Sequence, residues 1–386
     1  MGFRDPAASA AHLRAVCDQA EGIPELVAQA LAASPDPDLS AASLAALGEA
    51  LGAHRLMTAL HADPRQFERL AAVLGTSEGL GRFLFRHPEM VEELADPTLD
   101  GDRPDAADVR AGVLRAVGAD PDAAAATSTL DEAAGADALR VEYHRRLMRL
   151  AARDLTGRWE VDQVSAALAD LAGATVEGAL AVARGTVGLR ADTCRLSVIG
   201  MGKTGGRELN YVSDVDVIFV FEPAPGEDAE AARRAAMTLA TTLMHVCSAH
   251  TPEGTIWPVD AGLRPEGRSG PLVRTLDSHV AYYGKWAKTW EFQALLKARP
   301  IAGDPQLGAA YAAAISPLVW QASQREHFVG DVQGMRRRVV DHIPVHQADR
   351  QLKLGPGGLR DVEFSVQLLQ LVHGRVDPRL RTGNTL

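Results

Sequence analysis

One stretch of the chain, from Leu196 to Phe221, limits the fold more than any other. A short apolar run leads into a glycine-rich turn, and two aspartates then stand one residue apart at the head of a second apolar run. If the second run is a strand, Asp214 and Asp216 lie on one face, because side chains alternate with period two. Two such carboxylates repel each other unless a cation separates them, and a divalent metal usually fills that role. The stretch therefore predicts a metal site beside a turn whose backbone is open to phosphate.

Two common phosphate-binding motifs do not account for this turn. The dinucleotide fingerprint G-x-G-x-x-G is present at Gly200, Gly202 and Gly205. However, the next strand arrives too early to leave room for the crossover helix that this fingerprint opens. A Walker A loop would need its first glycine where the chain has Ser197. Neither motif therefore fits the residues around these glycines.

A third pattern, that of the nucleotidyltransferases, matches the chain in order. It places Gly-Gly at the start of a short helix, Asp-x-Asp on the following strand and a third acidic residue on a neighbouring strand. The chain supplies these parts as Gly205, Gly206, Asp214, Asp216 and Asp260. The ordered combination predicts a metal-dependent transfer of a phosphoryl or nucleotidyl group.

This pattern also predicts roles for the residues. Asp214 and Asp216 are expected to hold one or two Mg²⁺ or Mn²⁺ ions, which clamp the attacking and leaving oxygens of an in-line displacement. Asp260 either completes the metal shell or orients the nucleophile, and the sequence leaves both roles open. The N–H groups of residues 205–207, the last of which is Arg207, are expected to contact phosphate oxygens. Catalysis would then rest on positioning and charge neutralisation.

The composition fits a globular protein, since 46% of the 386 residues are hydrophobic. The net charge of −10 argues against non-specific nucleic-acid binding, so we expect a protein or a small nucleotide as partner. No window approaches the roughly 20 apolar residues of a membrane span, and the first residues lack a signal peptide's apolar core. The three cysteines are too scattered for a disulfide frame or a zinc cluster. We therefore expect a cytoplasmic monomer without nucleic-acid or membrane contacts.

Apolar periodicity predicts a mainly helical α+β protein with a small sheet. Residues 1–125 are rich in Ala and Leu at helical spacing, and only 96–126 looks like a loop. The strand expected at 215–221 is apolar throughout, which indicates burial on both faces. A helix is expected at 276–299, and the chain beyond it looks helical apart from the loop at 354–358. The other expected elements are helices at 136–155, 162–183 and 227–249 and strands at 194–199 and 255–260.

Four longer segments carry a family resemblance. They are GMGKTGGRELNYVSDVDVIFVF, WPVDAGLRPEG, TWEFQALLKARPIAGD and KLGPGGLRDVEFSVQ. In this order they resemble blocks in the N-terminal half of the glutamine synthetase adenylyltransferase and adenylyl-removing enzyme family, over about residues 195–367. The resemblance implies a polymerase-β-like nucleotidyltransferase core with a mixed sheet. This catalytic domain would span 126–302, between an N-terminal helical region at 1–125 and a C-terminal helical bundle at 303–386.

The resemblance also implies an activity and partners. In that family the N-terminal half removes AMP from a tyrosine of glutamine synthetase by phosphorolysis, which yields ADP, and the C-terminal half adds AMP from ATP. The PII signal protein and glutamine set the balance. We therefore expect adenylylated glutamine synthetase, phosphate or ADP, and the PII protein as partners. The final residues look like the start of a helix, so we also expect a truncated chain, with an adenylyltransferase half following in a longer polypeptide.

Further site residues are implied by the resemblance alone. It implies that Arg264 contacts an anion beside the site and that Lys353 and Arg360 reach the adenylyl group or inorganic phosphate. A surface charge or an interdomain ion pair explains Lys353 and Arg360 equally well. Trp290, in the third block, is interpreted as a core residue rather than a base-stacking platform.

The chain departs from the family pattern at two positions. Gly262 and Phe292 stand where the family usually has arginine. If either arginine binds phosphate, this chain binds phosphate differently. Two other functions stay open at this point: a forward nucleotidyltransferase that adenylylates or uridylylates a protein, and a non-catalytic regulatory module that binds the PII protein.

Overall fold

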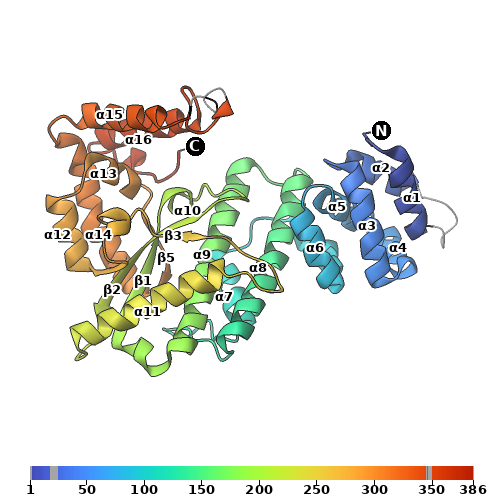
Figure 1. Cartoon of the computed structure of the whole chain (residues 1–386), viewed down its shortest axis with the longest axis horizontal. Coiled ribbons are helices and arrows are strands. Elements are labelled where there is room, and N and C mark those ends of the chain that lie inside the picture. The colour runs from blue at the N-terminus through green and yellow to red at the C-terminus, as the bar shows by residue number, and fades with distance from the viewer. Residues whose placement is uncertain (1, 18–24, 345, 347–349, 386) are drawn as a thin grey trace. The chain divides into compact units, whose positions relative to one another are not determined.

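The chain folds into two compact units, which the computed structural model describes for residues 2–17, 25–344, 346 and 350–385. Figure 1 shows the chain coloured by residue number. About 65% of the chain is helical and a small mixed sheet is present, so the expected mainly helical α+β class is confirmed. The first unit comprises Met1–Asp105 and Arg140–Ala167, and the second comprises Ala106–Leu139 and Leu168–Leu386.

The first unit is a bundle of short helices. Asp36 and Asp63 cap two of them, since each carboxylate accepts an N–H bond from the first helical turn and a proline follows directly. Buried leucines surround Phe67 and Phe83 in one apolar cluster. The elements are α1 (Pro6–Cys17), α2 (Glu25–Ala33), α3 (Pro37–Leu51), α4 (Ala53–Ala62), α5 (Pro64–Leu74), α6 (Glu78–Arg86) and the 3₁₀ segments η1 (Pro88–Ala95) and η2 (Pro97–Asp100).

The second unit is built around a five-stranded mixed sheet. Its central strand, β2, is antiparallel to β1 and parallel to β3 and β4, while β5 pairs antiparallel with β1. On β2, Val217 and Phe219 are buried on one face and Ile218 and Val220 on the other, which confirms the expected burial on both faces. The strands are β1 (Cys194–Gly200), β2 (Val215–Pro223), β3 (Val259–Asp260), β4 (Val273–Thr275) and β5 (Arg299–Gly303).

Helices cover this sheet, and several of them contain residues of the candidate functional site described below (Figure 1). Ile199, Ile218 and Val220 of the sheet form one apolar cluster with side chains of five later helices, such as Tyr311 and Leu371. Another helix, α11, contacts β1 and β2. The helices are α10 (Gly202–Gly206), α11 (Ala229–Ser248), α12 (Leu276–Lys285), α13 (Thr289–Leu295), α14 (Pro305–Gln321), α15 (Phe328–Asp341) and α16 (Leu359–His373).

Two long helices, α8 (Glu132–Leu155) and α9 (Val161–Val187), contribute residues to both units. We expected no window of the sequence to approach a membrane span. The helical span Val161–Thr193, which contains α9, is such a window. It is long and apolar enough by composition, with a mean hydropathy of 1.4, but 89% of the apolar window is buried inside the fold. We therefore interpret α9 as a core helix.

The stretch 96–126, expected as a loop, contains a helix. This helix, α7 (Ala106–Ala116), buries Val113 and Leu114 completely. It is short, and its two core residues are adjacent, so the sequence shows no repeated helical stripe there. The expectation of a loop was therefore wrong over these residues.

Three expectations near the sheet also need correction. The helix expected at 276–299 is two helices, α12 and α13, interrupted at residues 286–288. Residues 299–303 form β5 because they pair with β1. The sequence had predicted the end of a helix at residue 299 and helical structure after it. The strand expected at 255–260 is limited to Val259–Asp260. Strand pairing depends on distant segments, which local periodicity does not report.

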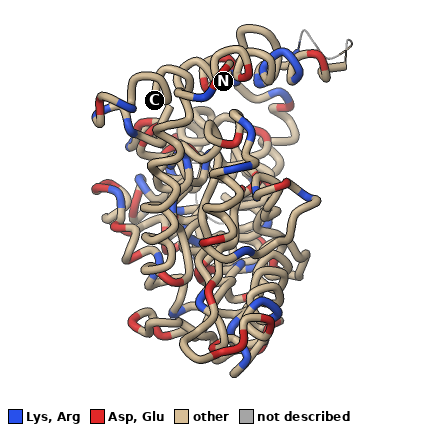
Figure 2. Tube along the Cα trace, turned by 90° about the vertical axis from the view of Figure 1, so that its left-hand side faces the viewer, with Lys and Arg blue, Asp and Glu red and all other residues tan. Residues whose placement is uncertain are grey.

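The compact units also differ from the expected domains at 1–125, 126–302 and 303–386. Residues 106–139 belong with the sheet, and the helices after 303 pack on the sheet in one continuous cluster. Figure 2 shows acidic and basic positions interspersed along the trace.

Candidate functional site

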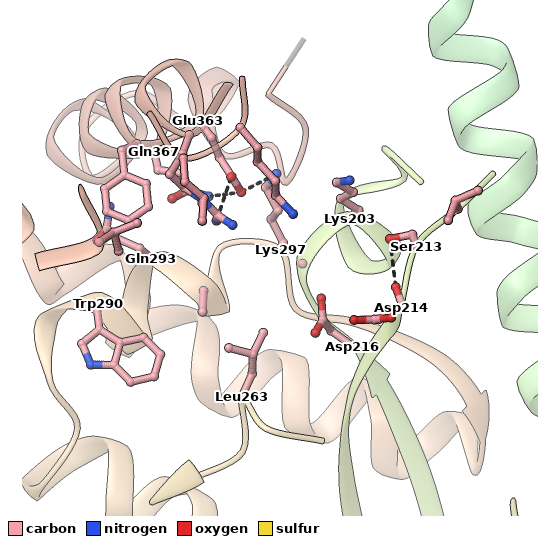
Figure 3. A pocket seen from close by; sticks show the side chains of 18 of the residues that line it. Lys203, Ser213, Asp214, Asp216, Leu263, Trp290, Gln293, Lys297, Glu363 and Gln367 are labelled. Carbon is pink, nitrogen blue, oxygen red and sulfur yellow. Dashed lines mark hydrogen bonds and ion pairs between the residues drawn. The ribbon is translucent and has the colours of Figure 1, made fainter. Parts of the chain in front are cut away.

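Register pairing places two of the expected carboxylates on neighbouring strands. Asp216 of β2 pairs with Asp260 of β3 in a parallel ladder, so the two side chains leave the sheet on the same face. Asp214 directly precedes β2, and Figure 3 shows it on the same side of a pocket as Asp216. Burial raises the pKa of Asp216 to about 6, and repulsion from Asp260 and Asp214 adds to the rise. The carboxylates therefore form a local excess of negative charge.

Asp260 is turned toward its own loop rather than toward a metal cluster. Its Oδ1 accepts the N–H of Gly262 at 2.7 Å, and its Oδ2 lies 3.8 Å from the guanidinium of Arg268. Among the described residues, no group of three or more His, Cys, Asp or Glu side chains is arranged to hold a metal ion. The structure thus brings Asp214 and Asp216 together and leaves Asp260 adjacent but engaged elsewhere.

The donor set fits a hard divalent cation. Asp214 and Asp216 offer only carboxylate oxygens, which are the ligands that Mg²⁺ and Mn²⁺ prefer. Burial and the neighbouring carboxylates Asp260 and Asp214 raise the pKa of Asp216, so the ionised form is disfavoured without a cation. A cation held between Asp214 and Asp216 would favour that form.

The glycine that faces the carboxylates is Gly202, not the expected pair. Gly202 has a positive φ of 51°, and a Cβ there would lie 2.5 Å from Oδ2 of Asp216. Only glycine lets the chain turn from β1 into α10 this close to the carboxylate. The sequence offered a signal, since Gly202 belongs to the G-x-G run, but it was interpreted only as part of a turn.

Gly205, Gly206 and Arg207 have other partners. The N–H of Gly205 donates to the carbonyl of Met201, and the N–H of Arg207 donates to the carbonyl of Thr204. A Cβ at Gly206 would lie 2.7 Å from the carbonyl oxygen of Gly383. The guanidinium of Arg207 bonds Asp170 at 2.6 Å. The geometry therefore gives no support to the expected phosphate contacts of residues 205–207.

Substitution of Gly205 by alanine is expected to destabilise the fold. A Cβ at this position would overlap the carbonyl oxygens of Lys297 and Gly200. These are main-chain atoms, so a change of side-chain rotamer cannot relieve the overlap. We expect the free energy of unfolding to fall by about 1–3 kcal/mol in urea denaturation. Gly284→Ala is the matched control, because nothing lies within 4 Å of a Cβ there and the site is helical. Equal stability of the two variants would contradict this packing.

Cationic side chains line the pocket together with the carboxylates. Lys353, Arg360 and Lys203 line the same pocket as Asp214 and Asp216. Lys353 and Arg360 lower the pKa of Asp216, which opposes the effect of burial. Burial, followed by repulsion from Lys353, lowers the pKa of Lys203. The structure therefore brings Lys353 and Arg360 to the carboxylates, with Lys203 as a third cation that the sequence-based site did not include.

A buried lysine, Lys297, also lines this pocket. Lys297 is 4% exposed, and its Nζ lies 2.6 Å from a carboxylate oxygen of Glu208 and 3.3 Å from one of Glu363. It also donates to the hydroxyl of Thr385 at 3.0 Å. Glu363 in turn pairs with Arg360 at 2.9 Å. Lys297 was missed as a site residue, although in the third block it directly follows the apolar residues Ala294, Leu295 and Leu296.

Arg264, which was expected to contact an anion, instead bonds main-chain carbonyls of its own loop. Its three guanidinium nitrogens donate to the carbonyls of Gly270, Ala261 and Arg268, at 2.9–3.1 Å. It lines a neighbouring depression together with Asp260 and Asp214, and Asp214 also lines the pocket that holds the cations. Gly262, one of the two departures, lies beside it and donates its N–H to Asp260.

The pocket has a volume of about 800 Å³ and combines a charged side with an apolar side. This volume is in the range of small-molecule sites. Trp290 lines the pocket and is only partly buried, so its interpretation as a core residue was wrong. Figure 3 shows Trp290 and Gln293 on one side of the pocket and the two aspartates on the other. The apolar side chains that join Trp290 are Ile256, Leu263 and Phe364.

Comparison with known proteins identifies the family. Residues 67–314 match the family model described as glutamate-ammonia ligase adenylyltransferase. The chain belongs to this family. Residues 333–386 also match the family model described as GlnD PII-uridylyltransferase.

Curated relatives extend this result over the whole chain. The chain is 52% identical over 390 residues to a Streptomyces avermitilis protein and 48% identical over 414 residues to a Nocardia farcinica protein, and each match covers 100% of the chain. A Bifidobacterium longum subsp. infantis protein is 47% identical and covers 92% of it. All three are named bifunctional glutamine synthetase adenylyltransferase/adenylyl-removing enzyme. The chain spans 34–38% of the length of these relatives and matches their N-terminal half, so the resemblance seen in the sequence is confirmed.

Proposed function

We propose that this chain removes AMP from an adenylylated tyrosine of glutamine synthetase by metal-dependent phosphorolysis. One observation carries the proposal: a single pocket is lined by two aspartates suited to a divalent cation and by four cationic side chains, of which Lys203, Lys353 and Arg360 are suited to phosphate. The names of the relatives, which include an adenylyl-removing activity, support the substrate. An enzyme is also a better explanation than a non-catalytic module, because the matching family model and the relatives are named as enzymes and the acidic residues at 214, 216 and 260 are all present.

In this reaction an oxygen of inorganic phosphate attacks the phosphorus of the adenylyl group. The bond from that phosphorus to the tyrosine oxygen breaks, the new P–O bond makes ADP, and the tyrosine oxygen takes up a proton. Attacking phosphate and adenylyl group are both anions, so they repel each other. Lys353, Arg360 and Lys203 offset this repulsion by facing the same pocket.

Asp214 and Asp216 would hold the metal, Mg²⁺ or Mn²⁺. The metal, when bound, supplies charge neutralisation at the reacting phosphoryl oxygens. Asp260 would join this site if its side chain left the N–H of Gly262, either to complete the metal shell or to orient the nucleophile.

The fold and the setting belong to the same proposal. We assign the mixed sheet, with its carboxylates on adjacent strands, to the polymerase-β-like nucleotidyltransferase type. The full protein would carry an adenylyltransferase half and respond to the PII protein, and the match to PII-uridylyltransferases over residues 333–386 supports a link to PII. The chain would act in the cytoplasm as a monomer.

The decisive experiment offers the chain both directions of reaction. Incubation with adenylylated glutamine synthetase, Mg²⁺ and phosphate is expected to release ADP, and omission of phosphate is expected to stop the release. Unmodified glutamine synthetase with ATP, and the PII protein with UTP, test the forward alternatives. Transfer of AMP or UMP in these reactions without ADP release from the adenylylated protein would overturn the proposal.

The pH dependence of metal binding is set by the pKa of Asp216. Its folded-state pKa of about 6 is above the ordinary value of 3.8, so without metal the fold loses stability as pH rises from about 4 to about 6. A metal needs the ionised carboxylate and competes with the proton. We therefore expect MgCl₂ or MnCl₂ to raise the melting temperature more at about pH 7.5 than at about pH 5. Thermal scans at matched ionic strength measure this, and equal shifts at both pH values would contradict it.

A further inference from the structure

Gln293 has a buried amide without a partner. It lies in α13, a short helix that is capped because Glu291 accepts the N–H of Lys288 at 3.0 Å. Gln293 is 2% exposed, and among the described residues neither its Nε2 nor its Oε1 has a hydrogen-bond partner. A buried amide in this state lowers the stability of the fold, because it has lost water and gained nothing. Such a group needs a physical explanation.

The other buried glutamines of the described chain are all satisfied. Gln66 donates to a main-chain carbonyl, and Gln370 donates to two. Gln367, which lines the same pocket as Gln293, donates to the carboxylate of Glu363 at 3.2 Å. The missing partners are therefore specific to Gln293 and not a general feature of buried glutamines in this fold.

The surroundings of Gln293 indicate what its partner is. Gln293 lines the pocket three residues after Trp290, so both side chains lie on one face of α13. Leu263 and Phe364 line the pocket with them. Figure 3 shows Trp290 and Gln293 across the pocket from the aspartates, with Lys297 between the two groups. A ligand that fills the pocket would have its charged end at the aspartates and a flat, largely apolar end at Trp290.

We propose that Gln293 recognises the adenine base of the AMP moiety, and this inference rests on the proposed function. A primary amide presents a donor and an acceptor side by side, and adenine offers the complement, an amino group next to a ring-nitrogen acceptor. The indole of Trp290 provides a flat surface for the base. A change of χ1 or χ2 between staggered rotamers would turn the amide from the wall into the pocket, and its soft last torsion would then align it with the base. Gln293 thus stays unpaired in the empty fold because its partner is the base.

Calorimetric titration of the chain in Mg²⁺ with three probes tests this assignment. The probes are ADP, purine riboside 5′-diphosphate, which lacks only the 6-amino group, and inorganic pyrophosphate, which lacks the nucleoside. The unmodified chain is expected to bind ADP about tenfold or more tightly than the analogue without the amino group. Gln293→Leu is expected to bind these two nucleotides equally and to bind pyrophosphate as the unmodified chain does. Gln367→Leu is the matched control and is expected to keep the preference for ADP.

The melting temperature of the ligand-free variant provides a second measurement. Gln293→Leu is expected to raise it by about 2–4 °C, because an unsatisfied amide is replaced by an apolar side chain of similar size. A lower melting temperature would reveal a structural partner for the amide and overturn the inference.

The outcomes separate the inference from the proposed function. If ADP and pyrophosphate bind but the 6-amino group adds nothing, or if Gln293→Leu keeps the preference for ADP, the base assignment is overturned and the nucleotide site stands. If neither ADP nor pyrophosphate binds the unmodified chain, the proposed function is overturned and the base assignment with it.

Discussion

Replacement of Asp216 by asparagine is expected to lower the rate of ADP release from adenylylated glutamine synthetase by about 10³-fold or more. Asparagine keeps the size of the side chain but removes the charge that would hold the metal. In β2, Asp216 is the partner of Asp260, and its carboxylate faces Gly202 closely. A neutral amide at this position binds a divalent cation more weakly than a carboxylate does. The rate is measured from ADP formed at saturating Mg²⁺ and phosphate.

The same variant is expected to fold at least as well as the unmodified chain. Burial and the neighbouring carboxylates raise the pKa of Asp216, so its charge is unfavourable in the metal-free fold. The ligand-free melting temperature at neutral pH should therefore stay equal or rise, which separates loss of activity from loss of structure. Glu227→Gln, an exposed change between β2 and α11, is the control and should leave the rate unchanged. More than a tenth of the original rate in Asp216→Asn would refute the metal assignment.

The sequence predicted where the carboxylates lie because two of them are close together in the chain and the third was expected on a neighbouring strand. Asp214 and Asp216 are two residues apart, directly before and within β2, and the alternation of side chains in an extended chain is enough to predict that they lie on one face. Asp260 was expected on a neighbouring strand, and the parallel pairing with Asp216 confirms that position. The pattern did not predict that Asp260 would bond the N–H of Gly262, because that bond depends on the conformation of the following turn.

Other residues of the site depend on segments that meet only in the folded chain. The need for glycine at 202 arises because the carboxylate of Asp216 comes within 2.5 Å of the Cβ position. Gln293 stands out because no side chain of the described residues reaches its amide. Residue spacing gives no signal for Gln293, and the G-x-G run marks Gly202 without showing that it faces a carboxylate. The sequence pattern predicted that Gly205 and Gly206 contact phosphate. In the fold their close neighbours are carbonyls of the distant residues Lys297 and Gly383, which residue spacing does not report.

Lys297→Met is expected to destabilise the second unit by about 3–5 kcal/mol. Methionine keeps the length of the side chain but removes the charge that lies 2.6 Å from Glu208 and 3.3 Å from Glu363. The side chains of these glutamates are only 12% and 25% exposed, so water compensates their charges poorly. Loss of one partner from a buried ion pair is costly because the other charge stays in place. Urea denaturation monitored by circular dichroism measures the change in the free energy of unfolding.

Two further variants show whether this cost comes from the unpaired carboxylates. Lys285→Met removes an exposed lysine of α12 and should change the free energy of unfolding by no more than about 0.5 kcal/mol. In the double variant Lys297→Met with Glu208→Gln, the charge of Glu208 is gone and Glu363 keeps Arg360 as a partner, so part of the lost stability should return. If the double variant is no more stable than Lys297→Met alone, the loss comes from side-chain packing and not from charge.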